Sequence, residues 1–441
     1  MNAVKSANNT KVKARELQRT LYLAAKANAK RRFHALYDKI YRLDILWEAW
    51  KRVKANRGSA GVDGVTIQSI VQEYGEIQFV RETQEQLKNS TYRPLPVRRR
   101  DIPKADGKTT RPLGIPVIRD RLVQMAAKMV LEPVFEADFR DCSFGFRPKR
   151  SAKGAMQKIQ YVVNHSKVYW VVDVDITGYF NNIQHDKLLK LVEQRISDRR
   201  MLKLIRQWLK AGVVEDGLFH VTELGSPQGG VISPLLANIY LNYLDTVWEK
   251  QFPHLGTLVR YADDLVVLCE KKAHALETIK VLKAVFKRLD LKMNTDKSKL
   301  VDLWIGKQGF DFLGYHHRRM PAMRKRGIVA HVLRSIPSKK AMKRMRARVT
   351  EEIGPRNRLY WTPRDIVEKL NPVIQGWQNY YTAVDPGASR SFLAKVYWHI
   401  NRRLMLYWRK KHKRSRLSYT QILQVFQNLG LKTVSGYGTQ L

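Results

Sequence analysis

Two apolar runs in the middle of the chain have the pattern of β-strands. The first, residues 168–176, contains the letters YWVVDVDI, and the second reads LVRYADDLVVLC. The second run divides into two short strands, 258–261 and 265–269. Asp263 and Asp264 lie between them, and aspartate favours turns because its side chain bonds nearby backbone. The pattern predicts a β-hairpin with an acidic tip, close to a strong β-strand.

Helical periodicity, with apolar residues three or four positions apart, surrounds these strands. Helices are expected at 38–55, 80–89, 118–137, 152 to about 164, 185–212, 235–249 and 273–289. Further strands are expected at 218–224, 299–304 and 309–316, and Asp106–Gly107 marks a hairpin with the return strand 108–115. This order of strands and helices predicts an α+β fold with acidic residues at one edge of a sheet.

The two ends of the chain have a different character. Residues 1–37 are polar and basic, and we expect a basic N-terminal extension of frayed helices that becomes ordered on RNA. Residues 318–348 contain many lysines and arginines and no acid. Ser338 is a good N-cap for a helix. Two longer helices are expected at 363–381 and 389–413, followed by a short helix in the tail.

The charge of the chain points to a polyanionic partner. The 441 residues include 81 Lys and Arg against 39 Asp and Glu, a formal net charge of +42, and 44% of the residues are hydrophobic. A globular chain with such a charge attracts nucleic acid first and an anionic membrane surface second. We find no 18-residue apolar run and no signal peptide, so no membrane partner is expected. Two cysteines make neither a disulfide framework nor a zinc site and fit a reducing cytosol.

Three aspartates are candidates for metal chemistry. The two-residue period of a strand puts Asp173 and Asp175 on one face. If the strands are neighbours, Asp175, Asp263 and Asp264 meet, and carboxylates so close raise one another's pKa unless a cation lies between them. Such a cluster can clamp two divalent ions about 3.5–4 Å apart. The alternatives are an ordinary acidic turn for the hairpin and a structural role for Asp173, and Asp264 is the weaker candidate ligand because adjacent turn residues diverge.

Eight blocks of sequence give the chain a resemblance to group II intron reverse transcriptase/maturases over nearly its whole length. The blocks are AGVDGVT (60–66), RPLGIPVIRDRLVQ (111–124), SFGFRPKRSA (143–152), DVDITGYFNNIQHDKL (173–188), GSPQGGVISPLLANIYLNYLD (225–245), RYADD (260–264), FLGY (312–315) and NPVIQGWQNYY (371–381). The resemblance implies a right-hand polymerase of fingers, palm and thumb, with a helical maturase region at the C-terminus.

The expected domains follow from that resemblance. They are a basic extension (1–37), fingers (38–165), palm (166–317, with 218–240 at the fingers/palm junction), thumb and maturase helices (318–416) and a C-terminal tail (417–441). Asn181 stands where the family often has Asp, which changes a neighbouring charge but no metal ligand. We see no His-Asn-His nuclease with paired cysteines, so the resemblance is to a compact, endonuclease-lacking member.

The resemblance also assigns residue roles around the incoming nucleotide. Asp175, Asp263 and Asp264 match aspartates that bind two Mg²⁺ ions, with Mn²⁺ as an alternative. Phe180 matches an aromatic residue that lies under the sugar and excludes a 2′-OH, although a Phe after a strand is ordinarily core. The remaining catalytic and nucleotide-binding matches are Lys104 and Arg111 (triphosphate), Gln228 (nascent base pair) and Lys297 (proton donor to pyrophosphate). Surface basic residues are ordinarily only solvated, and Gln228 alone reads as a simple loop.

Contacts with nucleic acid are implied in two other places. Primer or template contacts are implied for Tyr261, Gly314, Tyr315 and Arg147, although a plain hairpin explains Gly314 and Tyr315 equally well. A basic face near the C-terminus, which does not alternate in sign as solvated charge runs usually do, is the candidate for binding RNA. It comprises Arg402, Arg403, Arg409, Lys410, Lys411, Lys413 and Arg414. Trp377, Tyr380 and Tyr381 are expected to be core rather than base-stacking platforms.

The function that follows is RNA-directed DNA synthesis in the service of a group II intron. The expected partners are intron RNA, target DNA, an RNA template with a DNA primer, and dNTPs, with no obligate protein partner. The protein would assist splicing and support mobility by target-primed reverse transcription, in a cytoplasmic, nucleoid-associated setting of bacterial or organellar type. A reverse transcriptase of a retron, diversity-generating or CRISPR system is the alternative, with a non-catalytic RNA chaperone and an RNA-dependent RNA polymerase behind it. Residues 318–416 favour the intron.

Overall fold

The computed structural model describes residues 2–103, 110–215, 218–220, 224–225, 229–304, 306–323 and 329–433. Its centre is a four-stranded antiparallel sheet in the order β6-β7-β3-β8, which we call the palm sheet. The strands are β3 (Trp170–Val174), β6 (Thr257–Tyr261), β7 (Asp264–Cys269) and β8 (Lys299–Asp302). The predicted central strand and acidic hairpin are therefore neighbours in one sheet.

Both faces of the palm sheet are covered, which explains why its strands are almost continuously apolar. On one face Val172, Val174 and Val267 pack into the same core as the helices α10 (Ser233–Gln251) and α11 (Lys272–Arg288). The other face carries Val171, Val266 and Leu268, which share a smaller core with Ile159 and Val163. Those last two residues belong to α7 (Ala152–His165). The sheet is thus a rigid platform whose edge carries the acidic tip.

The fingers are a helical layer joined to the palm through one continuous core. Their helices are α1 (Asn2–Ala27), α2 (Tyr37–Ile40), α3 (Leu43–Ala55), α4 (Ile67–Ser69), η1 (Ile70–Tyr74), α5 (Glu76–Lys88) and α6 (Ile118–Glu136). The expectation of a frayed arm over residues 1–37 is wrong for the described part. Ala14, Leu21 and Ala25 of α1 are buried, and Gln18 Nε2 donates a hydrogen bond to the Met129 carbonyl of α6 at 3.0 Å. An apolar stripe hidden among the basic residues docks this helix.

A second sheet rises from the fingers. Its order is β2-β1-β4-β5, with β1 (Val97–Pro103), β2 (Thr110–Ile115), β4 (Val213–Glu215) and β5 (Leu218–His220). β1 and β2 form the predicted antiparallel hairpin, whose tip lies outside the described residues. The predicted helix over 185–212 is two helices, α8 (His185–Glu193) and α9 (Arg199–Leu209). Asp198 separates them because its carboxylate caps α9, accepting from the Arg200 and Met201 amides.

A third sheet lies between the palm and the thumb helices. The strand predicted over 309–316 is divided by a turn at Leu313 and Gly314, and the sequence did not predict the β10–β11 hairpin that follows. β9 (Gly309–Phe312), β10 (Tyr315–Met323) and β11 (Val329–Pro337) form an antiparallel sheet in the order β11-β10-β9. The thumb helices are α12 (Lys339–Ile353), η5 (Arg356–Arg358), α13 (Pro363–Tyr381), α14 (Pro386–Lys411) and α15 (Tyr419–Asn428). Ser338 caps α12 as predicted, accepting from the Ala341 amide. The tail helix α15 buries Phe426 in the thumb core, so it is part of this unit.

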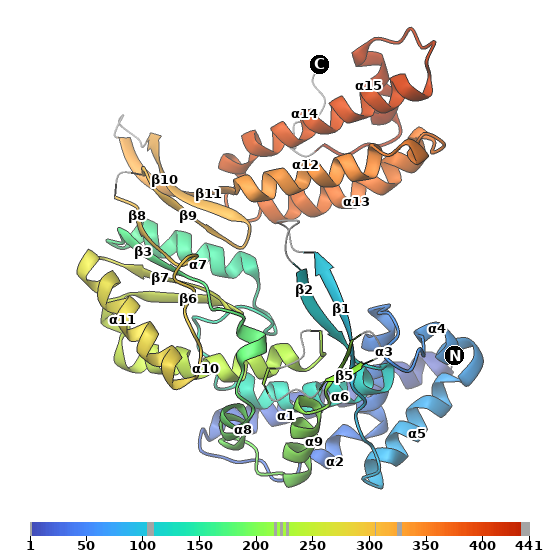
Figure 1. The fold of residues 1–441 in the computed structure, drawn as a ribbon, viewed down its shortest axis with the longest axis vertical. Helices are drawn as coiled ribbons and strands as arrows, with labels where there is room; N and C mark the ends of the chain where they lie inside the picture. The colour runs from blue at the N-terminus through green and yellow to red at the C-terminus, as the bar shows by residue number, and fades with distance from the viewer. Residues whose placement is uncertain are drawn as a thin grey trace.

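These parts are arranged along the long axis of the molecule. The thumb helices and the fingers helices lie at opposite ends, the palm sheet lies between them, and the β1–β2 hairpin projects from the fingers toward the thumb (Figure 1). None of the helices in the described part of the chain is long and apolar enough to cross a membrane.

Candidate active site

The acidic hairpin has a two-residue loop, Ala262 and Asp263. Tyr261 and Asp264 form the last pair of the β6–β7 ladder, so Asp264 is the first residue of β7. The sequence had suggested that Asp264 lies in the turn, and that prediction is wrong. Ala262 has φ +57°, a left-handed conformation that residues other than glycine adopt rarely. Strained backbone of this kind clusters at functional sites because the surroundings must hold it in place.

The register of the palm sheet brings the aspartates together. In the β3–β7 ladder Val174 is opposite Leu265, so the next residues along, Asp175 and Asp264, are neighbours where the ladder ends. Alternation along β7 also puts Asp264 on the face that carries Val266. Asp175 is fixed through its backbone, because its amide donates to Ser298 Oγ at 3.2 Å and its carbonyl accepts from the Asn294 amide at 2.8 Å.

The electrostatics of the tip show the crowding of negative charge. Desolvation by the surrounding protein, with the negative charges of Asp263 and Asp175, raises the pKa of Asp264 to about 6. Burial, reinforced by Asp175, also raises the pKa of Asp263. The positive charge of Arg111, on β2 of the fingers hairpin, opposes both pKa shifts.

This carboxylate set suits a hard divalent cation, which prefers oxygen ligands and would relieve the repulsion. Within the described residues, no three His, Cys, Asp or Glu side chains already converge closely enough to hold an ion. The residues fit the ion by donor type and by their shared edge.

Lys297 lies beside the aspartates. Its Nζ is 3.6 Å from Asp175 Oδ2, and its side chain is 68% exposed. The loop that carries it is held by Asn294, whose side-chain oxygen accepts from the Asp296 and Lys297 amides. An exposed ammonium on a fixed loop can meet an anionic group that arrives at the carboxylates.

Phe180 follows Asp175 on the short helix η2 (Tyr179–Asn182). Its ring is half-buried and lies 5.3 Å from that of Tyr179, so packing fixes it without hiding it. Gly225, with φ +90°, brings the glycine-rich turn against η2, since an added Cβ would lie 2.9 Å from the Phe180 carbonyl oxygen. Two predicted site residues, Lys104 and Gln228, lie outside the described residues.

The predicted primer and template residues have different surroundings. Tyr261 is half-exposed at the end of β6, with its ring 6.2 Å from that of the exposed Phe146. Gly314 forms the β9–β10 turn with φ +81°. Tyr315 is fully buried, packs against Tyr380 and Tyr381 at 5.4 and 5.2 Å, and donates to the Tyr380 carbonyl. We therefore abandon a direct primer contact for Tyr315, which belongs to the thumb core.

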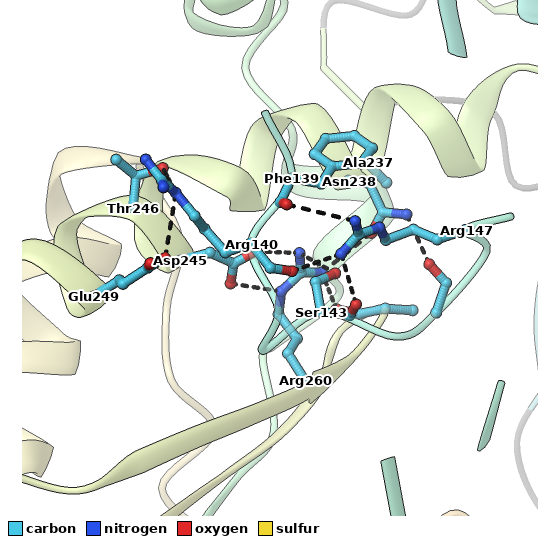
Figure 2. Close-up of polar contacts among 12 residues, drawn as sticks. Phe139, Arg140, Ser143, Arg147, Ala237, Asn238, Asp245, Thr246, Glu249 and Arg260 are labelled. Atoms are coloured by element: carbon cyan, nitrogen blue, oxygen red, sulfur yellow. Dashed lines mark hydrogen bonds and ion pairs between the residues drawn. The ribbon is translucent and has the colours of Figure 1, made fainter. Parts of the chain in front are cut away.

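Arg147 does not have a free guanidinium. Its side chain is 2% exposed, and its Nε and Nη2 both donate to the Glu136 carboxylate, with Nη2 2.7 Å from Oε1. Its other bonds go to the backbone carbonyls of Phe139, Arg140 and Ser143 (Figure 2). Such a side chain braces the loop 139–147 and cannot reach nucleic acid. The predicted primer or template contact of Arg147 is therefore wrong, because its side chain is buried.

The predicted basic face of the C-terminal region contains both exposed cations and cations that are bonded to the protein. Exposed members are Arg402, Arg409, Lys410, Lys413 and Arg414. Lys411 donates to the carbonyls of Leu359 and Trp361, and so it holds the loop before α13. Arg403 is half-buried. Of the predicted core aromatics, Tyr381 is buried, while Tyr380 is 36% exposed and donates to the Leu313 carbonyl.

The residue that sequence reasoning missed is Arg260, which precedes the acidic tip. Its side chain is fully buried and pairs with Asp245, a residue of α10 that is equally buried (Figure 2). Although burial opposes its charged form, Asp245 raises the pKa of Arg260. A signal was present in the sequence, because Arg260 occupies the same strand face as the apolar Leu258, where a charge is unexpected.

Comparisons with known proteins agree with this geometry. Residues 102–317 match the family model described as reverse transcriptase (RNA-dependent DNA polymerase), and residues 342–426 match the group II intron, maturase-specific domain. The chain is 34% identical to protein YkfC of Escherichia coli over 367 residues, which is 74% of this chain and 93% of YkfC.

Longer relatives are matched in part. The identity is 41% over 213 residues with the group II intron-encoded protein LtrA of Lactococcus lactis, covering 48% of this chain and 35% of LtrA. A 91 kDa protein in the cob intron of Schizosaccharomyces pombe is 28% identical over 417 residues, 79% of this chain and 50% of that protein. The chain thus spans about a third of LtrA and half of the yeast protein.

Proposed function

This chain belongs to the family of group II intron reverse transcriptase/maturases, and on that premise we propose that it copies RNA into DNA at the edge formed by Asp175, Asp263 and Asp264. The observation that carries the proposal is the β3–β7 register, which makes Asp175 and Asp264 neighbours beside the hairpin tip. The charge of Arg111 at the same place supports it.

A reverse transcriptase domain implies dependence on a divalent metal, and we assign two Mg²⁺ ions, replaceable by Mn²⁺, to the three aspartates. When bound, these ions supply activation of the primer 3′-hydroxyl and neutralise charge on the leaving pyrophosphate. The 3′-hydroxyl gives up its proton to solvent, and its oxygen bonds to the α-phosphorus of the dNTP as the α–β phosphoanhydride bond breaks. Lys297, whose Nζ is 3.6 Å from Asp175 Oδ2, would give a proton to the pyrophosphate.

Other residues select and hold the nucleotide. Arg111 binds the triphosphate together with Lys104, and an arginine does so bidentately. Phe180 lies under the sugar and excludes a 2′-OH. Gln228 lies at the nascent base pair, while Tyr261 and Gly314 contact the primer or template.

The second activity that we propose is binding of the host intron RNA. The thumb and maturase helices, with their exposed C-terminal cations, would hold the folded RNA while splicing chemistry remains the RNA's own. The fingers (38–165), palm (166–317) and thumb (318–416) would together carry the RNA template and DNA primer, and target DNA would bring the protein to the nucleoid or its organellar equivalent.

The test is the double variant Asp263→Asn, Asp264→Asn. We expect dNTP incorporation on an RNA template to fall by at least about 10³-fold, because loss of the carboxylate charges removes several kcal/mol of stabilisation. Intron RNA binding and splicing at low magnesium should persist. The control is Glu277→Gln on α11, whose side chain is 52% exposed. Retained incorporation by the double variant contradicts the assigned site.

A further inference from the structure

The guanidinium of Arg260 has all of its hydrogen-bonding groups satisfied. An arginine has five N–H donors. Here Nε and Nη2 donate to the two carboxylate oxygens of Asp245, Nη2 also to Ser143 Oγ at 2.8 Å, and Nη1 to Asn238 Oδ1 at 3.1 Å and to the Ala262 carbonyl at 2.8 Å. Figure 2 shows Arg260 pointing toward these partners from β6.

Stability alone gives no reason for a buried ion pair at this place. Replacing such a pair with well-packed apolar residues is often neutral or stabilising. The neighbouring residue on the same strand face, Leu258, is apolar and belongs to the main core. We therefore look for the role of this buried charge in the groups to which the guanidinium is hydrogen-bonded.

The guanidinium holds the hairpin tip. Its acceptor carbonyl belongs to Ala262, the residue with the left-handed backbone directly before Asp263. The loop 142–145 supports the tip from the side, since the Arg260 amide donates to the Cys142 carbonyl at 2.8 Å. A Cβ added to Gly145 would lie 2.4 Å from the Ala262 nitrogen. The position of the Asp263 carboxylate is thus set by contacts behind it.

The same network ties the tip to a helix of the palm. Asp245 and Asn238 are on α10, and Asn238 Nδ2 also donates to the Gly145 carbonyl at 2.8 Å. The helix therefore supports both the guanidinium and the loop 142–145 that lies beside the tip.

We propose that Arg260 is a positioning residue for polymerisation. Its five-bonded guanidinium fixes the tip of the β6–β7 hairpin, so that Asp263 is held in register with Asp175 at the proposed metal site. This inference rests on the proposed polymerase function.

The test uses two variants of the full-length protein. Arg260→Lys keeps the positive charge but loses the planar guanidinium and its five donors. The double variant Arg260→Met, Asp245→Leu fills the site with apolar side chains and removes both buried charges. We expect both to lower kcat by about 10²-fold, the effect of a displacement near 1 Å. The KM for dNTP should change by less than about threefold, because Arg260 bonds only to protein groups and a lost hydrogen bond to the nucleotide would have a larger effect. The Mg²⁺ concentration for half-maximal activity should rise.

A binding measurement accompanies the kinetics. Electron paramagnetic resonance of Mn²⁺ bound to a complex with a dideoxy-ended primer, RNA template and dNTP reports ion binding without turnover, and both variants should bind Mn²⁺ more weakly than the wild type. Melting temperatures show whether each variant is folded. The apolar pair is expected to melt below the wild type while remaining folded, because Asn238 Oδ1 and the Ala262 carbonyl lose their donor.

The matched control is Arg195→Lys. Arg195, between α8 and α9, is another buried arginine, paired with Asp138 at 2.5 Å and bonded to the carbonyls of Ala25 and Ala29 near the N-terminus rather than to the tip. It should lower the melting temperature without changing the Mg²⁺ requirement. A folded Arg260 variant with wild-type kcat and Mn²⁺ affinity overturns the inference, as does an equal shift in the control. A wild-type protein that incorporates no dNTP instead overturns the proposed function.

Discussion

Two hairpins approach the candidate active site, β6–β7 from the palm and β1–β2 from the fingers, and they are anchored at opposite ends. The palm hairpin is held at its tip by Arg260 and is buried on both faces. The fingers hairpin is held at its base. There the carboxylate of Asp120 on α6 accepts from the Tyr92 hydroxyl at 2.6 Å and from the Leu95 amide at 3.0 Å, just before β1 begins.

The difference matches the demands of the two chemistries. Metal ligands must keep their geometry to a fraction of an ångström, so the carboxylate tip is fixed. A group that binds triphosphate must meet each nucleotide and then release the product, and movable elements are suited to that task. Along β1 every residue after Arg98 is exposed, so this hairpin has no core packing comparable to that of the palm hairpin.

The largest effect is expected where the palm tip is pushed from its place. Gly145→Ala puts a Cβ 2.4 Å from the Ala262 nitrogen, and kcat should fall by about 10²-fold because the carboxylates move. Gly154→Ala is the control, since its Cβ would meet Phe144 at an ordinary 3.4 Å in the first turn of α7. Single-nucleotide incorporation at saturating dNTP measures both. Wild-type kcat in Gly145→Ala would show that the tip is not rigidly set.

A smaller and different effect is expected on the fingers hairpin. Arg111→Ala should lower kcat/KM for dNTP by roughly 10- to 100-fold, since a hydrogen bond to a charged group contributes about 1.5–3 kcal/mol. Arg99→Ala on the neighbouring strand is the control, because Arg99 pairs with Glu215 at 3.1 Å. Steady-state kinetics over a dNTP series separates the two. An equal loss of kcat/KM in both variants would mean that Arg111 contributes only to the overall positive charge of the hairpin and does not bind the triphosphate directly.

Sugar selection is expected to depend on neither hairpin but on η2. Phe180→Ala should raise incorporation of NTP relative to dNTP by about 10-fold or more, within the range for a changed pocket contact. Phe180→Tyr keeps the bulk and should preserve discrimination. Competition between dCTP and CTP on one template measures the ratio. Unchanged selectivity in Phe180→Ala would remove the sugar-gate assignment.

The smallest effect is a pH dependence at the base of the fingers hairpin. Burial raises the pKa of Asp120 to about 7, although the hydrogen bond from Tyr92 opposes the rise. The folded state therefore holds a proton that the unfolded chain releases near pH 4, so this residue's stabilising contribution is full at low pH and is lost as the pH rises through 7.

Asp120→Asn removes that dependence. Compared with this variant, the wild type should lose roughly 1–3 kcal/mol of relative stability between pH 5 and pH 8, since one pKa unit corresponds to about 1.4 kcal/mol. Urea unfolding followed by tryptophan fluorescence at both pH values measures the difference. Parallel pH profiles for the two proteins would show that Asp120 is ionised throughout, and Glu277→Gln serves as the exposed control.

Much of the fold follows from local pattern. The palm strand, the acidic hairpin, the helices α3, α10 and α11, and the cap at Ser338 were predictable because alternation, helical period and capping act over a few residues. The β10–β11 hairpin was missed because arginines on its solvated face hide the alternation that buries His317, Leu333 and Ser335. The docking of α1 was missed because its apolar stripe is narrow among polar residues.

By itself the sequence determined which carboxylates are candidates for metal binding, because alternation along a strand and the turn-forming Asp263 and Asp264 are local patterns. The roles expected of Phe180 and Arg111 came from the family resemblance of the sequence and stay predictions. Only the tertiary structure decided which basic and aromatic residues remain accessible. It placed Tyr315 and Arg147 inside, and it put Arg260 behind the catalytic tip, because burial depends on partners such as Asp245 and Ser143 that are distant in the chain. The type of each side chain can be read from the sequence, whereas its orientation and burial depend on the residues that pack against it in the folded chain.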